Sequence, residues 1–440
     1  IDTTIFHNIV RAFQKLTHCA GMLGEVSKVD RCLDYFRKAI ITVEHASNTE
    51  KDLKVNAPSH IRKSSGSAML STLSESIVGP DLNKDIQKEN DNIQLYPQSI
   101  NSKQVSLFRA LTSLAISLGP NFSAKSWYFL FTAWNWVYYF IYGPSNDILN
   151  SLNIDEEFIS HDLSRNDLAS IENTIHSFHD ATKSYPLQTL IIMLTELEKL
   201  SDLTLNLNPK DQVGYQPFFN NSEFSVAIYN PSFFISEIAE LTSSNMSRIL
   251  ASTKTSSYWD KFIDYMVSQM ADRKRTFALR LYCSHVIASV YKTCTNEIYE
   301  IEDTNLRKTC FTKYEQIFTS SLNRIMASIE VLEVNKLNIL NENLNTEGDI
   351  IFQVLNTLKE QLNEFGDMIS DSWVTVFSII NSPFRWIDSN ISTLLQDDSD
   401  DLSLIDGIIM KQKNMIQVSF DVFKLITDDF LKNLHLNVIP

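Results

Sequence analysis

The spacing of the apolar residues constrains the fold of this chain more than any other feature of its sequence. Apolar side chains recur at three- and four-residue steps, with clear stripes within 106–118, 318–329 and 351–369. This spacing places them on one face of an α-helix, and that face has to be buried against other helices. No comparably long run alternates apolar and polar residues with a period of two, so the pattern predicts an all-α fold.

Segments of this kind number about a dozen, and short polar turns separate most of them. Short connections make successive helices antiparallel, and several apolar stripes are wide enough to be sandwiched between two neighbours. We therefore expect a HEAT- or armadillo-like α-solenoid of stacked antiparallel helix pairs. No repeat of fixed length is visible, although residues 272–281 loosely resemble the second helix of a HEAT repeat.

Three segments interrupt the helical pattern. Residues from about 47 to 103 are rich in Ser, Asn, Asp and Lys, and we expect a disordered insertion there. Residues 211–230 are predicted to form an irregular connection, and residues from about 395 to 402 an acidic loop. The predicted domains are therefore a first helical-repeat subdomain over 1–210 and a second over 231–440.

Composition argues against several classes of function. With 10 glycines and 11 prolines in 440 residues, the chain is poor in the tight turns of parallel sheets and phosphate-binding loops. Its formal net charge of −15 argues against nucleic-acid binding and against flat association with an anionic membrane. The five cysteines are spaced neither as a zinc site nor as a disulfide framework, so we expect reduced thiols. Ile1 is not an initiator methionine and no leader is visible, so we expect a piece of a longer protein.

The most conspicuous local feature is the aromatic run 127–142, which has no charged residue. The run is short for a membrane span, which needs about 20 apolar residues, and Asn135 lies in its middle. We interpret it as a helix that its neighbours bury, while a partner surface and a membrane contact remain alternatives.

A small group of histidines and acids is the only candidate for metal chemistry. His176, His179 and Asp180 could share one helix face, and His161 and Asp162 lie nearby in the sequence. Two histidines at this spacing do not define a metal site, so we interpret them as a surface pair and predict no metal. No motif of nucleotide-binding loops, metalloproteases or serine hydrolases occurs, so we also predict no catalytic residue, no cofactor and no enzyme.

One dense basic cluster stands out in this acidic chain, and it consists of Arg273, Lys274, Arg275 and Arg280. Clustered positive charge can attract an anionic partner, either a phosphoinositide headgroup or an acidic protein. The alternative is solvated helix charge that offsets the acidic excess. The cluster is therefore a candidate contact for an anionic partner.

Several phrases of the sequence occur in an order that resembles one family, namely residues 6–40, 111–118, 126–127, 143–145, 231–234, 245–249, 351–362 and 371–374. Their order and spacing are similar to the helical region downstream of the Sec-seven domain in large Arf guanine-nucleotide exchange factors. The aromatic helix ending in Gly-Pro-Ser and the final helix over 415–431 most resemble the Mon-two type (also called Ysl-two), which lacks the catalytic Sec-seven domain. The composition, rich in Asn and Ile, suits a yeast.

The resemblance implies a non-catalytic scaffold segment of a peripheral protein that acts in endosome-to-Golgi vesicle traffic through protein binding. It implies a location on the cytoplasmic face of the trans-Golgi network and endosomes, with membrane association through partners. The implied partners are a Dopey-type protein, an aminophospholipid flippase and an Arf-like GTPase, without nucleic acid, and a homodimer of the whole protein stays open. The alternative is the regulatory downstream region of a catalytically active Arf exchange factor.

Four positions match the family phrases and are treated as family signature and as candidate interface residues: Trp127, Asn245, Arg248 and Trp373. The resemblance supplies no catalytic residue. We expect these side chains to pack, with Arg248 bracing a helix end or a neighbouring acid. The insertion at about 47–103 departs from the family pattern, which leaves a lineage-specific contact open.

Overall fold

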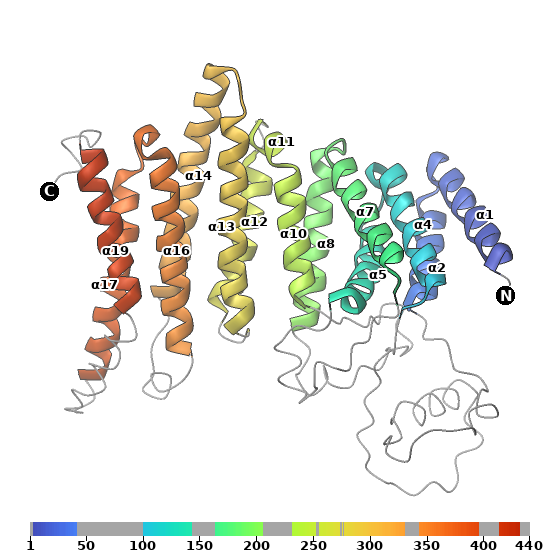
Figure 1. Cartoon of the computed structure of the whole chain (residues 1–440), viewed down its shortest axis with the longest axis horizontal. Helices are drawn as coiled ribbons and strands as arrows, with labels where there is room; N and C mark the ends of the chain where they lie inside the picture. Colours follow the sequence, from blue (N-terminus) through green and yellow to red (C-terminus); the bar gives the residue numbers. More distant parts are fainter. Residues whose placement is uncertain are drawn as a thin grey trace, which may run out of the picture. The chain divides into compact units, whose positions relative to one another are not determined.

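The structure is a computed structural model that describes residues 3–41, 100–142, 163–205, 231–251, 255–272, 275, 277–330, 343–395 and 413–431 (Figure 1). These residues form fourteen α-helices with a few short 3₁₀ and π turns, and none of them lies in a strand. The predicted all-α fold is therefore confirmed. None of the described helices is both long enough and apolar enough to cross a membrane.

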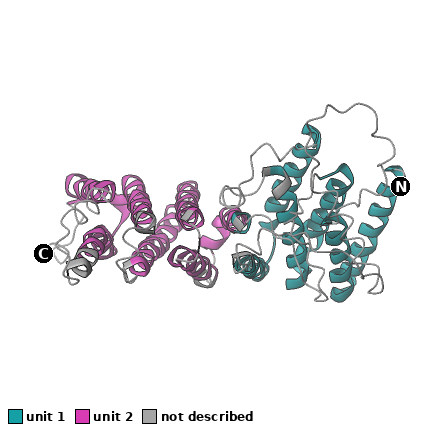
Figure 2. Ribbon diagram, turned by 90° about the horizontal axis from the view of Figure 1, so that it is seen from below, with its two compact units in different colours: residues 1–234 teal, residues 235–440 magenta. Residues whose placement is uncertain are grey.

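The chain divides into two compact units, Ile1–Phe234 and Ile235–Pro440, which are coloured separately in Figure 2. The division falls inside helix α10 (Pro231–Ser244). The expected connection over 211–230 lies outside the described residues, so the predicted subdomain boundaries stay a prediction.

The first unit is a two-layer stack of helices. Its helices are α1 (Thr3–Met22), α2 (Val26–Ile41), α4 (Ser102–Leu118), α5 (Ala124–Tyr142), α7 (Arg165–Thr182) and α8 (Leu187–Leu205). Helices α1, α4 and α7 pack on one another in that order, and α2, α5 and α8 form the second layer in the same way. Each successive helix pair adds one helix to each layer, which is the architecture of an α-solenoid.

The second unit repeats this arrangement. After α10, its helices are α11 (Met246–Ala251), α12 (Thr255–Ala271), α13 (Phe277–Tyr299), α14 (Thr304–Glu330), α16 (Asn343–Phe365), α17 (Trp373–Leu395) and α19 (Lys413–Leu425). One layer consists of α12, α14 and α17, and the other of α13, α16 and α19. Figure 1 shows the helices of this unit standing side by side. The sequence-based prediction of an all-α solenoid agrees with both units.

The aromatic run forms the centre of the first unit's core. Trp127, Trp134 and Trp136 of α5 are all buried, and so are the apolar side chains between them. A helix that is apolar on every side has to be covered on every side, and α5 lies among α2, α4 and α8. The interpretation of this run as a buried core helix is therefore confirmed over residues 127–137, whereas Tyr138 and Ile141 are half-buried.

The end of the predicted insertion needs a correction. Asn101 caps α4, because its side-chain oxygen accepts from the backbone N–H of Gln104 at 3.0 Å while the Gln104 side chain accepts from the backbone N–H of Asn101 at 2.9 Å. The Gln104 amide also donates to the carbonyl of Ile40 at 2.8 Å, which joins α4 to the end of α2. Helix α4 therefore begins at Ser102, so the expected end of the insertion at about 103 falls inside its first turn, since a reciprocal cap fixes this turn locally. Residues 42–99 and 396–402 lie outside the described part.

Candidate functional site

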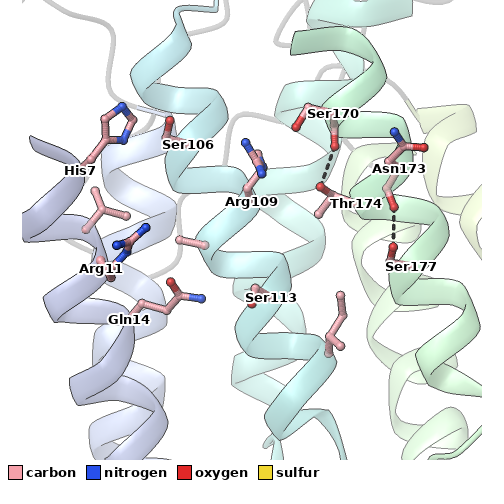
Figure 3. Close-up of a pocket in the computed structure, with 13 residues that line it drawn as sticks. His7, Arg11, Gln14, Ser106, Arg109, Ser113, Ser170, Asn173, Thr174 and Ser177 are labelled. Carbon is pink, nitrogen blue, oxygen red and sulfur yellow. Dashed lines mark hydrogen bonds between the residues drawn. The ribbon is translucent and has the colours of Figure 1, made fainter. Parts of the chain in front are cut away.

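The first unit contains a surface groove between the helices of one layer. Helices α1, α4 and α7 each contribute side chains at steps of three and four residues, which is the spacing of one helix face. The groove has a volume of about 620 Å³ and is lined by His7, Val10, Arg11, Gln14, Ser106, Arg109, Ala110, Ser113, Ile116, Ser170, Asn173, Thr174 and Ser177. Figure 3 shows the labelled side chains of the three helices around this groove.

The charge of the groove has one sign. Arg11 and Arg109 are exposed, and no Asp or Glu is among the lining residues. Helices α1 and α4 contain no acidic residue at all. Within the described part of the chain, neither guanidinium has a hydrogen-bond or ion-pair partner. The groove is therefore a local positive surface in a chain whose formal net charge is −15.

The polar groups of the groove differ in what they can still donate. The hydroxyls of Ser106, Thr174 and Ser177 donate to carbonyls of their own helices, at 3.0, 2.6 and 2.7 Å respectively. These three hydroxyls have used their hydrogen and can only accept a further bond. The donors that remain for a ligand are the two guanidinium groups, the side-chain amides of Gln14 and Asn173, the hydroxyls of Ser113 and Ser170, and the imidazole of His7. The groove consequently favours a ligand rich in acceptors.

Trp127 lies at the centre of the core of the first unit. Its side chain is 0% exposed, and its ring contacts Phe122, Phe131, Phe178 and Tyr185 at centroid distances of 5.1 to 6.4 Å. Rings at these distances and tilts attract one another in addition to the area that they bury. The structure places Trp127 in the core and away from the surface, so packing is the role that its position supports.

Asn245 and Arg248 form a hydrogen-bonded pair at the junction of α10 and α11. The Asn245 amide donates to the carbonyl of Leu241 at 2.9 Å, and its oxygen accepts from the Arg248 guanidinium at 2.9 Å. Asn245 is fully buried, and partial burial lowers the pKa of the Arg248 guanidinium. The pair satisfies backbone and side-chain groups where the chain passes from one helix to the next, which is the bracing role expected for Arg248.

Trp373 begins α17 and is buried. Its indole N–H donates to the carbonyl of Ile369 at 3.2 Å, and its ring lies 6.0 Å from the ring of Phe430. This arrangement closes the turn before α17 and packs it against the last turn of the described chain. Within the second unit, Trp373 thus has surroundings of its own at the start of α17, whereas Asn245 and Arg248 pair at the junction of α10 and α11.

The structure describes two residues of the basic cluster, Arg275 and Arg280, and Arg280 does not lie at the surface. Arg280 is 1% exposed, donates to the carbonyl of Met270 at 2.7 Å and lies 3.6 Å from the carboxylate of Glu347, which is also buried. Arg280 is therefore not available for the anionic contact expected from the sequence, because its charge is already compensated inside the second unit. The side chain of Arg275 lies 3.1 Å from Asp272. Arg273 and Lys274 lie outside the described residues.

The histidines of α7 do not assemble a metal site. His176 is exposed and lies 3.5 Å from Asp180, whereas His179 is buried with its ring 6.3 Å from that of Trp134. Among the described residues, no three His, Cys, Asp or Glu side chains are placed to hold a metal ion. His161 and Asp162 lie outside the described part.

The sequence analysis missed the groove. A partial signal exists, because the twenty residues of α1 contain Arg11, Lys15 and two histidines but no acid. The remaining lining residues come from α4 and α7, and Arg109 of α4 lies more than 90 positions after Arg11 in the sequence. Helical periodicity identifies each stripe but does not say which stripes lie side by side.

Comparison with known proteins gives one informative match. The chain is 38% identical to Protein MON2 of Saccharomyces cerevisiae over 461 aligned positions, which include all of this chain and 28% of that relative. It therefore spans less than a third of the length of the relative. No protein-family description matches the sequence, and no solved structure matches it.

Proposed function

This chain belongs to the Mon-two family as a segment of a longer protein, and from that premise we propose that it is a non-catalytic scaffold segment in endosome-to-Golgi vesicle traffic. The observation that carries the proposal is the 38% identity to Protein MON2 over the whole chain. The scaffold acts on the cytoplasmic face of the trans-Golgi network and endosomes, as part of a peripheral protein that binds other proteins.

The architecture supports a binding role. Stacked helix pairs present long faces whose side chains are not needed for the core, and such faces suit protein partners. Several large apolar side chains are exposed, among them Ile5, Ile9, Leu16 and Leu23 in the first unit and Val374, Phe420 and Phe423 in the second. A few apolar or arginine anchors supply most of the energy in protein interfaces. The described surface offers anchors of both kinds.

The family resemblance extends the proposal to partners. A Dopey-type protein, an aminophospholipid flippase and an Arf-like GTPase are the proposed partners of the whole protein, and its homodimerisation belongs to the same proposal. The chain contributes no cofactor-dependent chemistry in this scheme. The match to Protein MON2 over the full chain favours this reading over the regulatory region of an active Arf exchange factor.

A replacement experiment tests the proposal in a yeast cell. The matching segment of Protein MON2 is exchanged for this chain, and a second strain carries a deletion of the same segment. We expect the exchanged protein to keep its Golgi location and to co-purify with the proposed partners by mass spectrometry. The deletion strain should lose at least one of them. If the deletion retains the location and every partner, the segment is not a scaffold.

A further inference from the structure

We propose that the groove between α1, α4 and α7 binds an acidic segment of a partner protein, whose carboxylates pair with Arg11 and Arg109. No family likeness enters this inference, which goes beyond the proposed function because it does not depend on the organelle or on the identity of the scaffold's partners. Three features of the groove support the proposal: its charge, the hydrogen-bond donors of its lining side chains, and its dimensions.

Charge complementarity selects an anionic ligand. The lining residues contain two arginines and one histidine but no carboxylate, whereas the whole chain has 53 acidic and 38 basic residues. The positive charge of the groove attracts anions, and screening by salt confines that field to roughly 10 Å. An anionic segment is therefore attracted at the groove, where no carboxylate of the lining opposes it.

The donors select carboxylates on a polypeptide. A guanidinium presents two parallel N–H groups that match the two oxygens of a carboxylate. The side-chain amides of Gln14 and Asn173 can pair with backbone carbonyl and N–H groups, because an amide both donates and accepts. Val10, Ala110 and Ile116 add an apolar surface for one side chain of the ligand. This mixture of a few charges with neutral amides and apolar contacts suits a peptide.

The dimensions also suit a peptide that crosses the helices. The stripes of α1 and α7 cover two helical turns, or about 10 Å along the axis, and that of α4 covers about 15 Å, while three packed helices extend over roughly 20 Å. An extended chain advances about 3.3 Å per residue, so about six residues cross the groove. An anionic glycerophospholipid membrane is a poorer occupant, because its surface offers no backbone amides for the side chains of Gln14 and Asn173.

Peptide binding to the whole chain tests the proposal. Fluorescein-labelled peptides of about twelve residues, twice the estimated crossing length, carry two glutamates at systematically varied spacings. We expect fluorescence anisotropy to show binding of at least one spacing, no binding of its glutamine version, and weaker binding as NaCl is added. The double variant Arg11→Glu/Arg109→Glu should bind that peptide roughly tenfold more weakly.

A matched variant separates the groove from general charge. Arg31→Glu/Lys292→Glu makes the same change in net charge at exposed positions outside the groove, and it should bind as the parent chain does. Far-ultraviolet circular dichroism should show that both double variants stay folded. Equal weakening in the two double variants overturns the proposal, and so does the absence of binding at every spacing. Binding of phosphatidylserine vesicles through Arg11 and Arg109 without peptide binding also overturns it.

Discussion

The carboxylate of Glu315 in α14 accepts the backbone N–H of Ser372, the residue before α17, at 3.0 Å. The same oxygen accepts the backbone N–H groups of Ser370 and Asp371, at 3.1 and 3.0 Å. The first N–H groups of a helix have no partner inside the helix, and a negative charge is favourable there. A side chain 57 positions earlier in the sequence therefore holds the beginning of α17.

Removal of this carboxylate should destabilise the second unit. We expect Glu315→Ala to lower its free energy of unfolding by about 2–4 kcal/mol, because one buried and two partly buried backbone donors lose their acceptor. Glu315→Gln keeps one acceptor oxygen without the charge and should cost roughly half as much. Urea unfolding followed by labelling of Cys283, Cys294 and Cys310 reports on this unit, since all three are buried in it.

The control for this prediction is Glu360→Gln, which changes an exposed glutamate of α16 and should shift the unfolding curve by less than about 0.5 kcal/mol. If Glu315→Ala unfolds at the same urea concentration as the control, the carboxylate does not stabilise the start of α17.

The aromatic core of the first unit should depend on Trp127. Truncation by Trp127→Ala removes a fully buried ring from contact with four others, and we expect a loss of about 3–5 kcal/mol in the free energy of unfolding. Tyr35→Ala truncates an aromatic side chain that is 57% exposed and should cost less than about 1 kcal/mol. Urea denaturation followed by circular dichroism measures both. Unchanged stability combined with lost partner binding would place Trp127 at an interface instead.

The close approach of Gly119 and Tyr185 should be sensitive to a single methyl group. A Cβ at Gly119 would lie 2.7 Å from the Tyr185 ring, which is buried and held by a hydrogen bond from its hydroxyl to the carbonyl of Ala115 at 2.7 Å. The ring cannot move aside without losing that bond, so Gly119→Ala should cost about 1–3 kcal/mol.

A double-mutant cycle identifies the cause of this loss. In a Tyr185→Ala background the added methyl has room, and Gly119→Ala should then cost less than about 1 kcal/mol. Thermal or urea unfolding of the four proteins provides the coupling energy. An equal cost of Gly119→Ala in both backgrounds would show that the contact with Tyr185 is not responsible.

Arg280 and Glu347 form a buried ion pair, and removal of one partner should destabilise the second unit more than removal of both. Arg280→Met leaves the Glu347 carboxylate buried without its cation, and we expect a loss of about 3–5 kcal/mol in the free energy of unfolding. Replacement of both partners in Arg280→Met/Glu347→Leu removes the uncompensated charge and should recover most of that loss. Denaturation curves of the single and double variants provide the measurement, and a double variant less stable than Arg280→Met would contradict this expectation.

The thiols should react in an order set by burial. Burial raises the pKa of the Cys283 thiol to about 12 and also raises the pKa of Cys294, so that almost no thiolate forms at either residue near pH 8. Cys19 is exposed and should react first with a disulfide reagent. We expect Cys283 and Cys294 to react only after urea unfolds the second unit, as followed spectroscopically. Rapid reaction of all five thiols in the folded chain would contradict the burial of these cysteines.

The sequence by itself determined which segments are helical. Hydrophobic spacing is a local property, so the stripes within 106–118 and 351–369 predicted helices that the structure contains as α4 and α16. The uncharged aromatic run predicted a helix covered on all sides, because exposing that many rings to water is unfavourable at any place in a fold. The family resemblance also followed from the sequence, since it depends on the order of short phrases.

Only the tertiary structure decided which helices lie side by side. The basic cluster is an example. Arg280 closely follows Arg275 in the sequence, but its guanidinium lies beside the buried carboxylate of Glu347 in α16. The groove depends on the packing of α1 and α7 against α4, and the cap of α17 depends on Glu315 of α14. Local periodicity fixes the face of each helix that is buried, whereas partners come from packing between segments distant in the chain, which no local pattern encodes.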